Sequence, residues 1–292
     1  MHIDFVKMNG AGNDFVLIGD YFDQLHLSNE QVQWICDRHF GVGADGVIVV
    51  KPSINPDAVA FMDYYNSDGT KAEMCGNGIR CFSKFLVDGG VVESGSDSFA
   101  VDTLSGKKEI SILRDIEGNM QLATVDMGAP ILEPSKVPTT LSGVPTEWGS
   151  VALEQEIVVD GRTYKATCVS MGNPHAVIFV DDPLTFPATE IGPKIETLGV
   201  FPEKTNVEFA HVDGDVITMR VWERGCGETL ACGTGCCATA VAAHMTGRAG
   251  RKVTLKVLGG EIGIEWSEEG GDLGSVIMTG PAKKAFAGSL EI

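Results

Sequence analysis

The spacing of hydrophobic residues along the chain predicts the same series of strands and helices in each half. Short β-branched or aromatic runs at 15–18, 47–50 and 59–65 predict strands, and matching runs follow at 176–180, 207–210 and 216–222. A helix is predicted at 28–39, because Ser28 and Gln31 have the spacing of a capping box, and its counterpart at 188–198 is weakened by a Gly-Pro pair. The pattern indicates an α+β fold.

A second helix in each half carries apolar residues on nearly every face. Ile79, Phe82, Phe85 and Leu86 line the first, and the second contains Cys-Cys-Ala-Thr-Ala-Val-Ala-Ala at 236–243. A helix without a polar face is buried inside its domain. We therefore expect two similar, pseudo-symmetric domains, each a β-sheet wrapped around a central buried helix.

Four short patterns recur in the same order in the two halves, which indicates an internal duplication. They align Asn13 with Asn173, Asp45 with Asn206, Asn66 with Glu223 and Cys75 with Cys232, and the partners lie 157–161 residues apart. Between the halves, the segment 126–150 carries four prolines among serine, threonine and glycine, which is typical of a linker. The predicted domains are 1–130 and 131–276.

Composition and charge exclude some binding partners and indicate the cell compartment. A net charge of −18 and a pI near 4.6 argue against nucleic acid and anionic membranes, since both favour clustered Lys and Arg. The N-terminus lacks the pattern of a signal peptide, and no apolar run approaches the length of a membrane span. The eight cysteines indicate free thiols in a reducing compartment. We expect a cytoplasmic location, and an organelle stroma reached after removal of a transit peptide stays open.

The candidate chemistry lies at Cys75 and Cys232, where a Cys-Gly-x-Gly segment enters each buried helix. The positive end of a helix lowers the pKa of a nearby thiol, and glycines let an anion approach the first N–H groups. Two helix starts related by an approximate two-fold axis would offer a thiol each to one cleft between the domains. Inverting a carbon centre by proton transfer requires this arrangement, with a base on one face and an acid on the other.

The other cysteines also allow two different interpretations. Cys36, Cys81, Cys168, Cys236 and Cys237 fit buried, inert packing residues, which is the usual role of a free cysteine. Cys226, Cys232, Cys236, Cys237 and His244 lie close in sequence and offer a metal site, but the spacing is not that of paired zinc ligands. The sequence therefore predicts no metal and no cofactor. The alternative to an enzyme that inverts a carbon centre is a thiol redox or metal-binding protein.

Three motifs together resemble diaminopimelate epimerase along essentially the whole chain. They are Asn-Gly-Ala-Gly-Asn-Asp-Phe at 9–15, Glu-Met-Cys-Gly-Asn-Gly at 73–78, and Glu-Arg-Gly at 223–225 followed by Ala-Cys-Gly-Thr-Gly at 231–235. The resemblance implies cofactor-independent, pyridoxal-phosphate-free epimerisation of LL-2,6-diaminoheptanedioate to the meso isomer, in lysine and peptidoglycan precursor synthesis. It also implies that the last strand, at about 277–292, returns to the first domain. Proline and hydroxyproline racemases, which also use two cysteine thiols, are the alternative. Their first motif resembles Cys-Gly-His-Gly, whereas this chain has Asn77 at the third position.

The resemblance also implies roles for individual residues. Cys75 and Cys232 match the two acid/base groups, and His175 and Glu223 match positions that assist the proton transfer. The matches to substrate-binding positions are Asn13, Asn66, Gly76, Asn77, Asn173, Asn206, Glu223, Arg224, Gly233 and Thr234. Arg224 supplies a planar fork suited to a carboxylate, whereas Asp45 stands where some members have Gln. The expected partner is a small amino-acid substrate, with a homodimer expected from the family.

Overall fold

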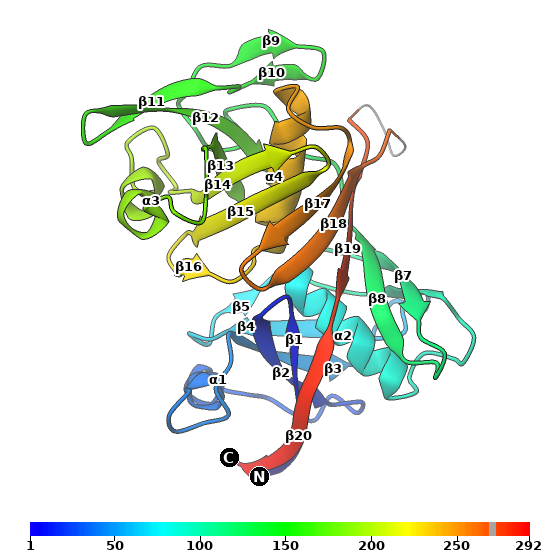
Figure 1. The fold of residues 1–292 in the computed structure, drawn as a ribbon. Helices are drawn as coiled ribbons and strands as arrows, with labels where there is room; N and C mark the ends of the chain where they lie inside the picture. Colours follow the sequence, from blue (N-terminus) through cyan, green and yellow to red (C-terminus); the bar gives the residue numbers. More distant parts are fainter. Residues whose placement is uncertain (269–272) are drawn as a thin grey trace. The chain divides into compact units, whose positions relative to one another are not determined.

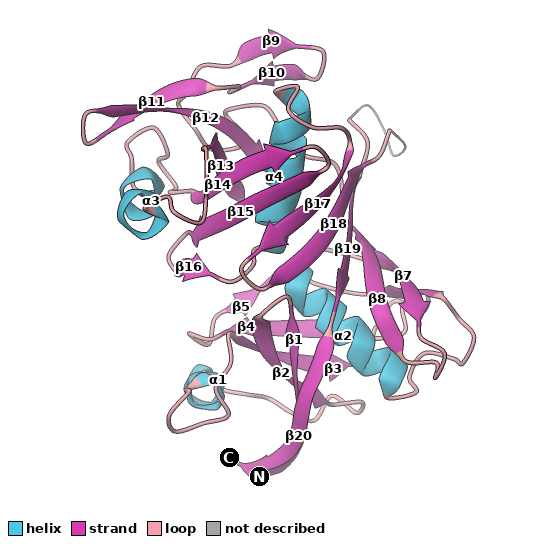
Figure 2. Cartoon of the chain, viewed as in Figure 1, coloured by secondary structure: helices cyan, strands magenta, loops and turns pink. Residues whose placement is uncertain are grey.

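The computed structural model describes residues 1–268 and 273–292, which form two compact units. Unit 1 is Met1–Asp126 with Thr279–Ile292, and unit 2 is Met127–Met278. The chain passes from unit 2 back to unit 1 within β19 (Val276–Pro281). Both units combine strands with a few helices, which confirms the α+β class (Figure 2). The functional domains 1–130 and 131–276 stay predictions.

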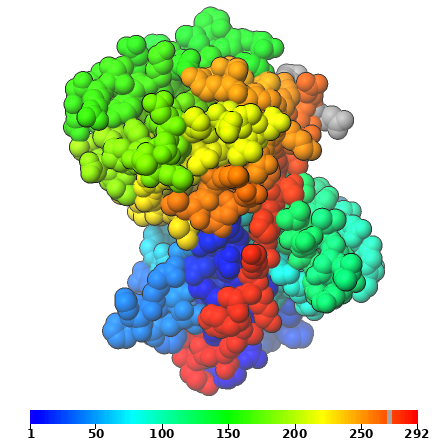
Figure 3. Space-filling model, in the orientation of Figure 1, coloured from blue at the N-terminus to red at the C-terminus, as the bar shows by residue number. Residues whose placement is uncertain are grey.

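The main sheet of unit 1 has the strand order β20-β1-β2-β3-β4-β5. Its strands in chain order are β1 (His2–Gly10), β2 (Asn13–Gly19), β3 (Gly46–Lys51), β4 (Phe61–Asn66), β5 (Lys71–Ala72) and β20 (Lys283–Glu291). β2 and β3 run parallel and are connected through α1 (Asn29–Cys36), whereas β3 and β4 are antiparallel. β20 pairs antiparallel with β1, so side chains from the two ends of the chain lie side by side in red and blue (Figure 3).

Three further strands of unit 1, β6 (Ser98–Val101), β7 (Lys108–Arg114) and β8 (Met120–Asp126), form an antiparallel series. The central helix of the unit is α2 (Gly76–Asp88), which contacts β1, β2, β3 and β8 (Figure 1). Its buried face includes Ile79, Phe82 and Leu86, and also the fully buried Arg80. The prediction that strands enclose this helix is confirmed for unit 1.

Unit 2 repeats the strand pattern of unit 1 around its own helix. Its strands are β11 (Gln155–Val159), β12 (Arg162–Ser170), β13 (Pro174–Phe179), β14 (Asn206–Asp213), β15 (Val216–Glu223), β16 (Gly227–Thr229), β17 (Lys252–Val257) and β18 (Gly260–Trp266), with a hairpin of β9 (Val144–Thr146) and β10 (Gly149–Val151). β13 and β14 are parallel and connected through α3 (Ala188–Glu196), and β14 and β15 are antiparallel. This is the order found for β2, α1, β3 and β4.

The central helix of unit 2 is α4 (Gly233–Met245), which contacts β12–β15, β17 and β18. Only Thr234 and His244 are partly exposed along it, so the helix without a polar face is buried as predicted. No helix within the described ranges is both long enough and apolar enough to span a bilayer.

Element boundaries differ from the predictions where side chains intervene. α1 has the predicted capping box on Ser28 and Gln31, but it ends at Cys36 instead of continuing to 39. Asp37 leaves the helical conformation, and its carboxylate accepts hydrogen bonds from the backbone N–H groups of His39 and Phe40. α3 ends at Glu196, two residues early, with Pro193 inside it.

Candidate active site

In unit 1, three polar residues singled out in the sequence lie at one edge of the main sheet. β2 begins at Asn13, β3 begins directly after Asp45, and β4 ends at Asn66. Because β2 and β3 are parallel and β4 runs the other way, these three ends meet at the same edge. Gly46 pairs with Phe15 on one side and with Asn66 on the other.

Unit 2 places the matching residues in the same way. Asn173 directly precedes β13, Asn206 is the first residue of β14, and Glu223 is the last residue of β15. His175 lies beside Asn206 in the parallel pair. The internal repeat read from the sequence therefore corresponds to a repeated strand edge.

Each candidate cysteine is the N-cap residue of the central helix of its unit. Cys75 and Cys232 have extended backbone angles, and each Sγ accepts a hydrogen bond from the N–H three residues later, at 3.4 Å for Gly78 and 3.4 Å for Gly235. Ser, Thr, Asp or Asn usually occupies an N-cap, and here a thiol does. The first turns, Gly76-Asn77 and Gly233-Thr234, are where a helix start presents N–H groups to an anion.

The contacts in unit 1 bring Asn13, Cys75 and Asn77 together. The side-chain oxygen of Asn13 lies 3.8 Å from Cys75 Sγ and accepts a hydrogen bond from Asn77 Nδ2 at 3.4 Å. Asp45 accepts from Asn13 Nδ2 at 2.7 Å, so it supports the orientation of Asn13. Asn66 donates to Thr70 Oγ1 in its own turn, at 3.1 Å.

In unit 2, hydrogen bonds tie the predicted residues to the ends of the strands. The Asn206 side chain donates to the Pro174 carbonyl at 2.8 Å and accepts from the Arg224 backbone N–H at 2.9 Å. Glu223 accepts from Thr229 Oγ1 at 2.5 Å. The Arg224 side chain is exposed and donates to the Glu203 carbonyl at 3.1 Å, which leaves its guanidinium near the surface.

Electrostatics at Cys232 differ from the prediction made from the helix dipole. Burial raises the pKa of the Cys232 thiol well above its ordinary value, and the charges of Glu223 and Glu208 raise it further. Hydrogen bonds from Thr234 and Gly235 act in the opposite direction but are outweighed. The expectation of a lowered pKa at this helix start is therefore wrong for Cys232, because a buried thiol beside two carboxylates disfavours a further negative charge.

Glu223 also has a perturbed carboxyl group. Burial raises the pKa of Glu223, and the charge of Glu208 adds to the effect. Hydrogen bonds with Thr229 and Cys232 and the charge of His175 lower it in part. A buried carboxyl group with a raised pKa next to a thiol is suited to exchanging a proton with it.

Five of the remaining cysteines are buried like packing residues, namely Cys36, Cys81, Cys168, Cys236 and Cys237. Burial raises the pKa of Cys36, Cys81 and Cys168 to about 12, whereas Cys226 is exposed. Within residues 1–268 and 273–292, no group of three or more His, Cys, Asp or Glu side chains is arranged to hold a metal ion.

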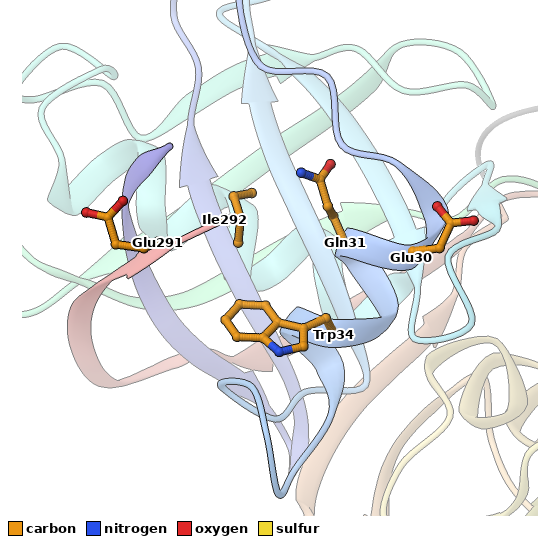
Figure 4. A pocket seen from close by; sticks show the side chains of 5 residues that line it. All are labelled: Glu30, Gln31, Trp34, Glu291 and Ile292. Atoms are coloured by element: carbon orange, nitrogen blue, oxygen red, sulfur yellow. The ribbon is translucent and has the colours of Figure 1, made fainter.

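A separate pocket of about 260 Å³ lies in unit 1, lined by Glu30, Gln31, Trp34, Glu291 and Ile292 (Figure 4). These side chains come from α1 and from the end of the chain, where Glu291 is the last residue of β20 and Ile292 follows it. None of the predicted site residues lines the pocket.

Two buried charges beside the cysteines were not singled out from the sequence. Arg80 donates to the Asn77 side-chain oxygen and to the Gly76 carbonyl, both at 3.0 Å, and so supports the first turn of α2. Glu208 contacts His175 from β14. Each had a detectable signal, since Arg80 follows Ile79 in a mostly buried helix turn and Glu208 lies between Val207 and Phe209, and a charge in such a place is unusual.

The chain is similar over its whole length to proteins of one family. The family described as diaminopimelate epimerase matches residues 5–133 and 167–285. A diaminopimelate epimerase of Leptospira biflexa serovar Patoc is 47% identical over 294 residues, covering 100% of this chain and 100% of that protein. One from Synechococcus elongatus is 46% identical over 296 residues, covering 100% and 99%.

A solved structure described as a probable proline racemase, from Agrobacterium radiobacter, has a TM-score of 0.68 at 17% identity and covers 99% of this chain and 93% of that one. At such identity the likeness shows a shared fold. The assignment to a family comes from the full-length identity of 46–47% and from the match of the family over most of the chain. The chain therefore belongs to the diaminopimelate epimerase family and is an isomerase of the amino-acid epimerase class.

Proposed function

We propose that this enzyme converts LL-2,6-diaminoheptanedioate to the meso isomer with Cys75 and Cys232 as its two acid/base groups and without a cofactor. The reaction belongs to lysine and peptidoglycan precursor biosynthesis, in keeping with the family to which the chain belongs. The observation that carries the proposal is the repeated helix start. In each unit a cysteine caps the central helix, and the next three residues are glycine, one other residue and a second glycine.

The proposed chemistry moves one proton off the α-carbon and another onto its opposite face. The Cys75 thiolate takes the α-proton and becomes a thiol, while the Cys232 thiol delivers its proton and becomes a thiolate. The raised pKa of Cys232 supports this assignment in the LL-to-meso direction, since a thiol that holds its proton is the acid. The negative charge passes into the substrate carboxylate, which the first-turn N–H groups of Gly76-Asn77 and Gly233-Thr234 would stabilise.

Recognition of the substrate is proposed for the strand-edge residues. Asn13, Asn66, Asn173 and Asn206 offer amide groups to an amino-carboxylate, and the Arg224 guanidinium suits the distal carboxylate. The Asn206 side chain holds the Arg224 backbone, which supports a shared role for the two residues. His175 and Glu223 would assist the proton transfer, and the raised pKa of Glu223 fits a group that exchanges protons.

The decisive experiment follows configuration and isotope together in deuterated water with LL-diaminopimelate as substrate. Meso product carrying deuterium at the inverted carbon is expected, and neither L-proline nor hydroxyproline should be racemised. Cys75→Ala and Cys232→Ala should each abolish epimerisation. Cys168→Ala, which removes a buried thiol inside β12 that caps no helix, should retain it. Epimerisation of more than a few per cent of the original rate in a folded Cys75→Ala or Cys232→Ala protein would rule out the two-thiol mechanism.

A homodimer and a cytoplasmic location also belong to this proposal. Light scattering on the purified enzyme tests the dimer, and microscopy of the tagged enzyme in its native cell tests the location.

A further inference from the structure

Glu208 is a buried carboxylate that the proposed proton transfer does not use. It lies in β14 between the core residues Val207 and Phe209, and its side chain is 0% exposed. A charge in such a place is costly unless specific partners compensate for it. The contacts of Glu208 therefore indicate what the residue is for.

One strong partner of the Glu208 carboxylate is the His175 ring. Oε1 lies 2.7 Å from Nδ1 of His175, which is also 0% exposed. Glu208 pairs with Val177 in the parallel strands, so His175, two residues before Val177, is on the same face of the sheet. The other oxygen, Oε2, is buried and has no hydrogen-bond partner among the described residues. A carboxylate accepts but does not donate, so the arrangement places a proton on Nδ1.

The carboxylate also rests against the first turn of α4, the helix that Cys232 caps. A Cβ atom at Gly235 would lie 2.7 Å from Glu208 Oε1 and 3.2 Å from Cys232 Cβ. Glycine at this position therefore makes room for the carboxylate. The positive end of the helix stabilises the buried negative charge there.

With Nδ1 bound to Glu208, the second nitrogen of His175 is turned to Asn173. Nε2 lies 3.1 Å from the end of the Asn173 side chain, at the atom placed as Oδ1. Because a neutral ring with its proton on Nδ1 has only a lone pair on Nε2, we assign the Asn173 amide with Nδ2 at this position, where it donates to Nε2. The three side chains form a chain of contacts, from a fixed carboxylate under the helix start to an amide at the edge of the strands. Glu208, at one end of this series of contacts, comes from β14, and Asn173, at the other end, directly precedes β13. The register of the two strands therefore sets the distance between them.

We propose that Glu208 is a positioning residue, which fixes the tautomer and orientation of His175 and, through Nε2, the Asn173 side chain. The consequence for turnover rests on the proposed function, in which Asn173 binds the substrate. The structural part, a proton on Nδ1 of His175 held by Glu208, is independent of any substrate.

Two substitutions separate the hydrogen bond from the charge. Glu208→Leu has a similar volume but no acceptor, whereas Glu208→Gln keeps an acceptor oxygen and loses the charge. Glu154→Gln is the control, because it removes another carboxylate of the same unit. Glu154 pairs with Arg248 at 2.8 Å, and neither residue is among the proposed site residues. We expect Glu208→Leu to lower kcat/KM by roughly 10- to 100-fold, which is the size of effect seen when the hydrogen-bond partner of a metal-bound histidine is removed. Glu208→Gln should stay within about tenfold of the unsubstituted enzyme, and the control should be unchanged.

The readout that a purely structural role would not move is the tautomer of His175. Nitrogen NMR of histidine-labelled protein without substrate should show a proton on Nδ1 in the unsubstituted protein and in Glu208→Gln, and its transfer to Nε2 in Glu208→Leu. A His175 ring without a proton on Nδ1 in the unsubstituted protein overturns the proposal, whether or not the Leu variant folds. A folded Leu variant with unchanged kcat/KM also overturns it. If the enzyme does not turn over diaminopimelate at all, the proposed function fails while the tautomer still reports on Glu208.

Discussion

Replacing Gly235 by Ala probes how tightly α4 packs on the carboxylate of Glu208. The added Cβ would lie 2.7 Å from Oε1, closer than side chains tolerate, and 3.4 Å from Cys232 Sγ. Oε1 is the end of a side chain, but it is held at 2.7 Å by His175 and is fully buried. The carboxylate must therefore move away and lose part of its hydrogen bond to His175.

The expected cost follows from two opposing effects. Weakening a buried hydrogen bond to a charged group costs about 1.5–3 kcal/mol. Alanine is better than glycine inside a helix by up to about 1 kcal/mol, which offsets part of the loss. We expect Gly235→Ala to destabilise the protein by about 1–2 kcal/mol, which lowers the melting temperature by roughly 2–8 °C.

The matched control is Gly78→Ala, at the equivalent position of α2. There the added Cβ would meet the terminal methyl carbons of Met62 at 3.1 Å and Ile48 at 3.2 Å. These are flexible side-chain ends without a hydrogen bond to lose, so the control should cost less than Gly235→Ala.

The assay is a double-mutant cycle followed by thermal melting and circular dichroism. In a Glu208→Ala background the clash is absent, so Gly235→Ala should be neutral or slightly stabilising. The coupling between the two sites should be about 1–2 kcal/mol, within the range for residues in direct contact. An equal loss of stability from Gly235→Ala in both backgrounds would show that Glu208 is not what the helix start packs against.

Three further outcomes are expected. Arg224→Lys keeps the charge but loses the planar fork, so KM for diaminopimelate should rise with little change in thermal stability. An unchanged KM in steady-state kinetics would show that another residue binds the distal carboxylate. Burial alone raises the pKa of Asp14, but hydrogen bonds from Arg38 and Lys7 outweigh it and lower the pKa to about 2. Because this folded pKa is below the ordinary value, its stabilisation of about 2 kcal/mol is present above pH 4 and lost as the pH falls towards 2. Melting curves of Asp14→Asn and the unsubstituted protein should therefore differ at pH 6 and converge near pH 2. Activity assays should survive chelators and carbonyl reagents but not iodoacetamide, and loss of activity with a chelator would contradict cofactor independence.

The duplicated architecture is readable in the sequence because the repeat is local. Asn13 and Asn173 start strands, and Cys75 and Cys232 start helices, so each carries a nearby signature of strand periodicity or glycine spacing. The capping box at Ser28 was predictable for the same reason, since both of its partners lie within one helical turn.

Features that depend on distant segments were not predictable in the same way. The raised pKa of Cys232 comes from burial and from carboxylates on β14 and β15, which no local pattern around residue 232 contains. α1 ends at Cys36 because the Asp37 carboxylate accepts a hydrogen bond from the backbone N–H of His39. This local hydrogen bond competes with continuation of the helix. Glu208 had a signal, a charge between Val207 and Phe209 in the buried part of its strand, but its partner His175 is set by strand register.

The pairing of β20 with β1 has a consequence for how the chain is made. His2 lies opposite Glu291 and Ile3 opposite Leu290, so an edge of the unit 1 sheet is completed by residues that leave the ribosome after all of unit 2. Unit 2 is one continuous stretch and can fold during synthesis, while β1 must wait with one side unpaired. A waiting strand of this kind is open to pairing with other chains. The nascent enzyme should therefore depend most on chaperones between the emergence of β1 and the arrival of β20, and slowed translation of the final segment should lengthen that exposure.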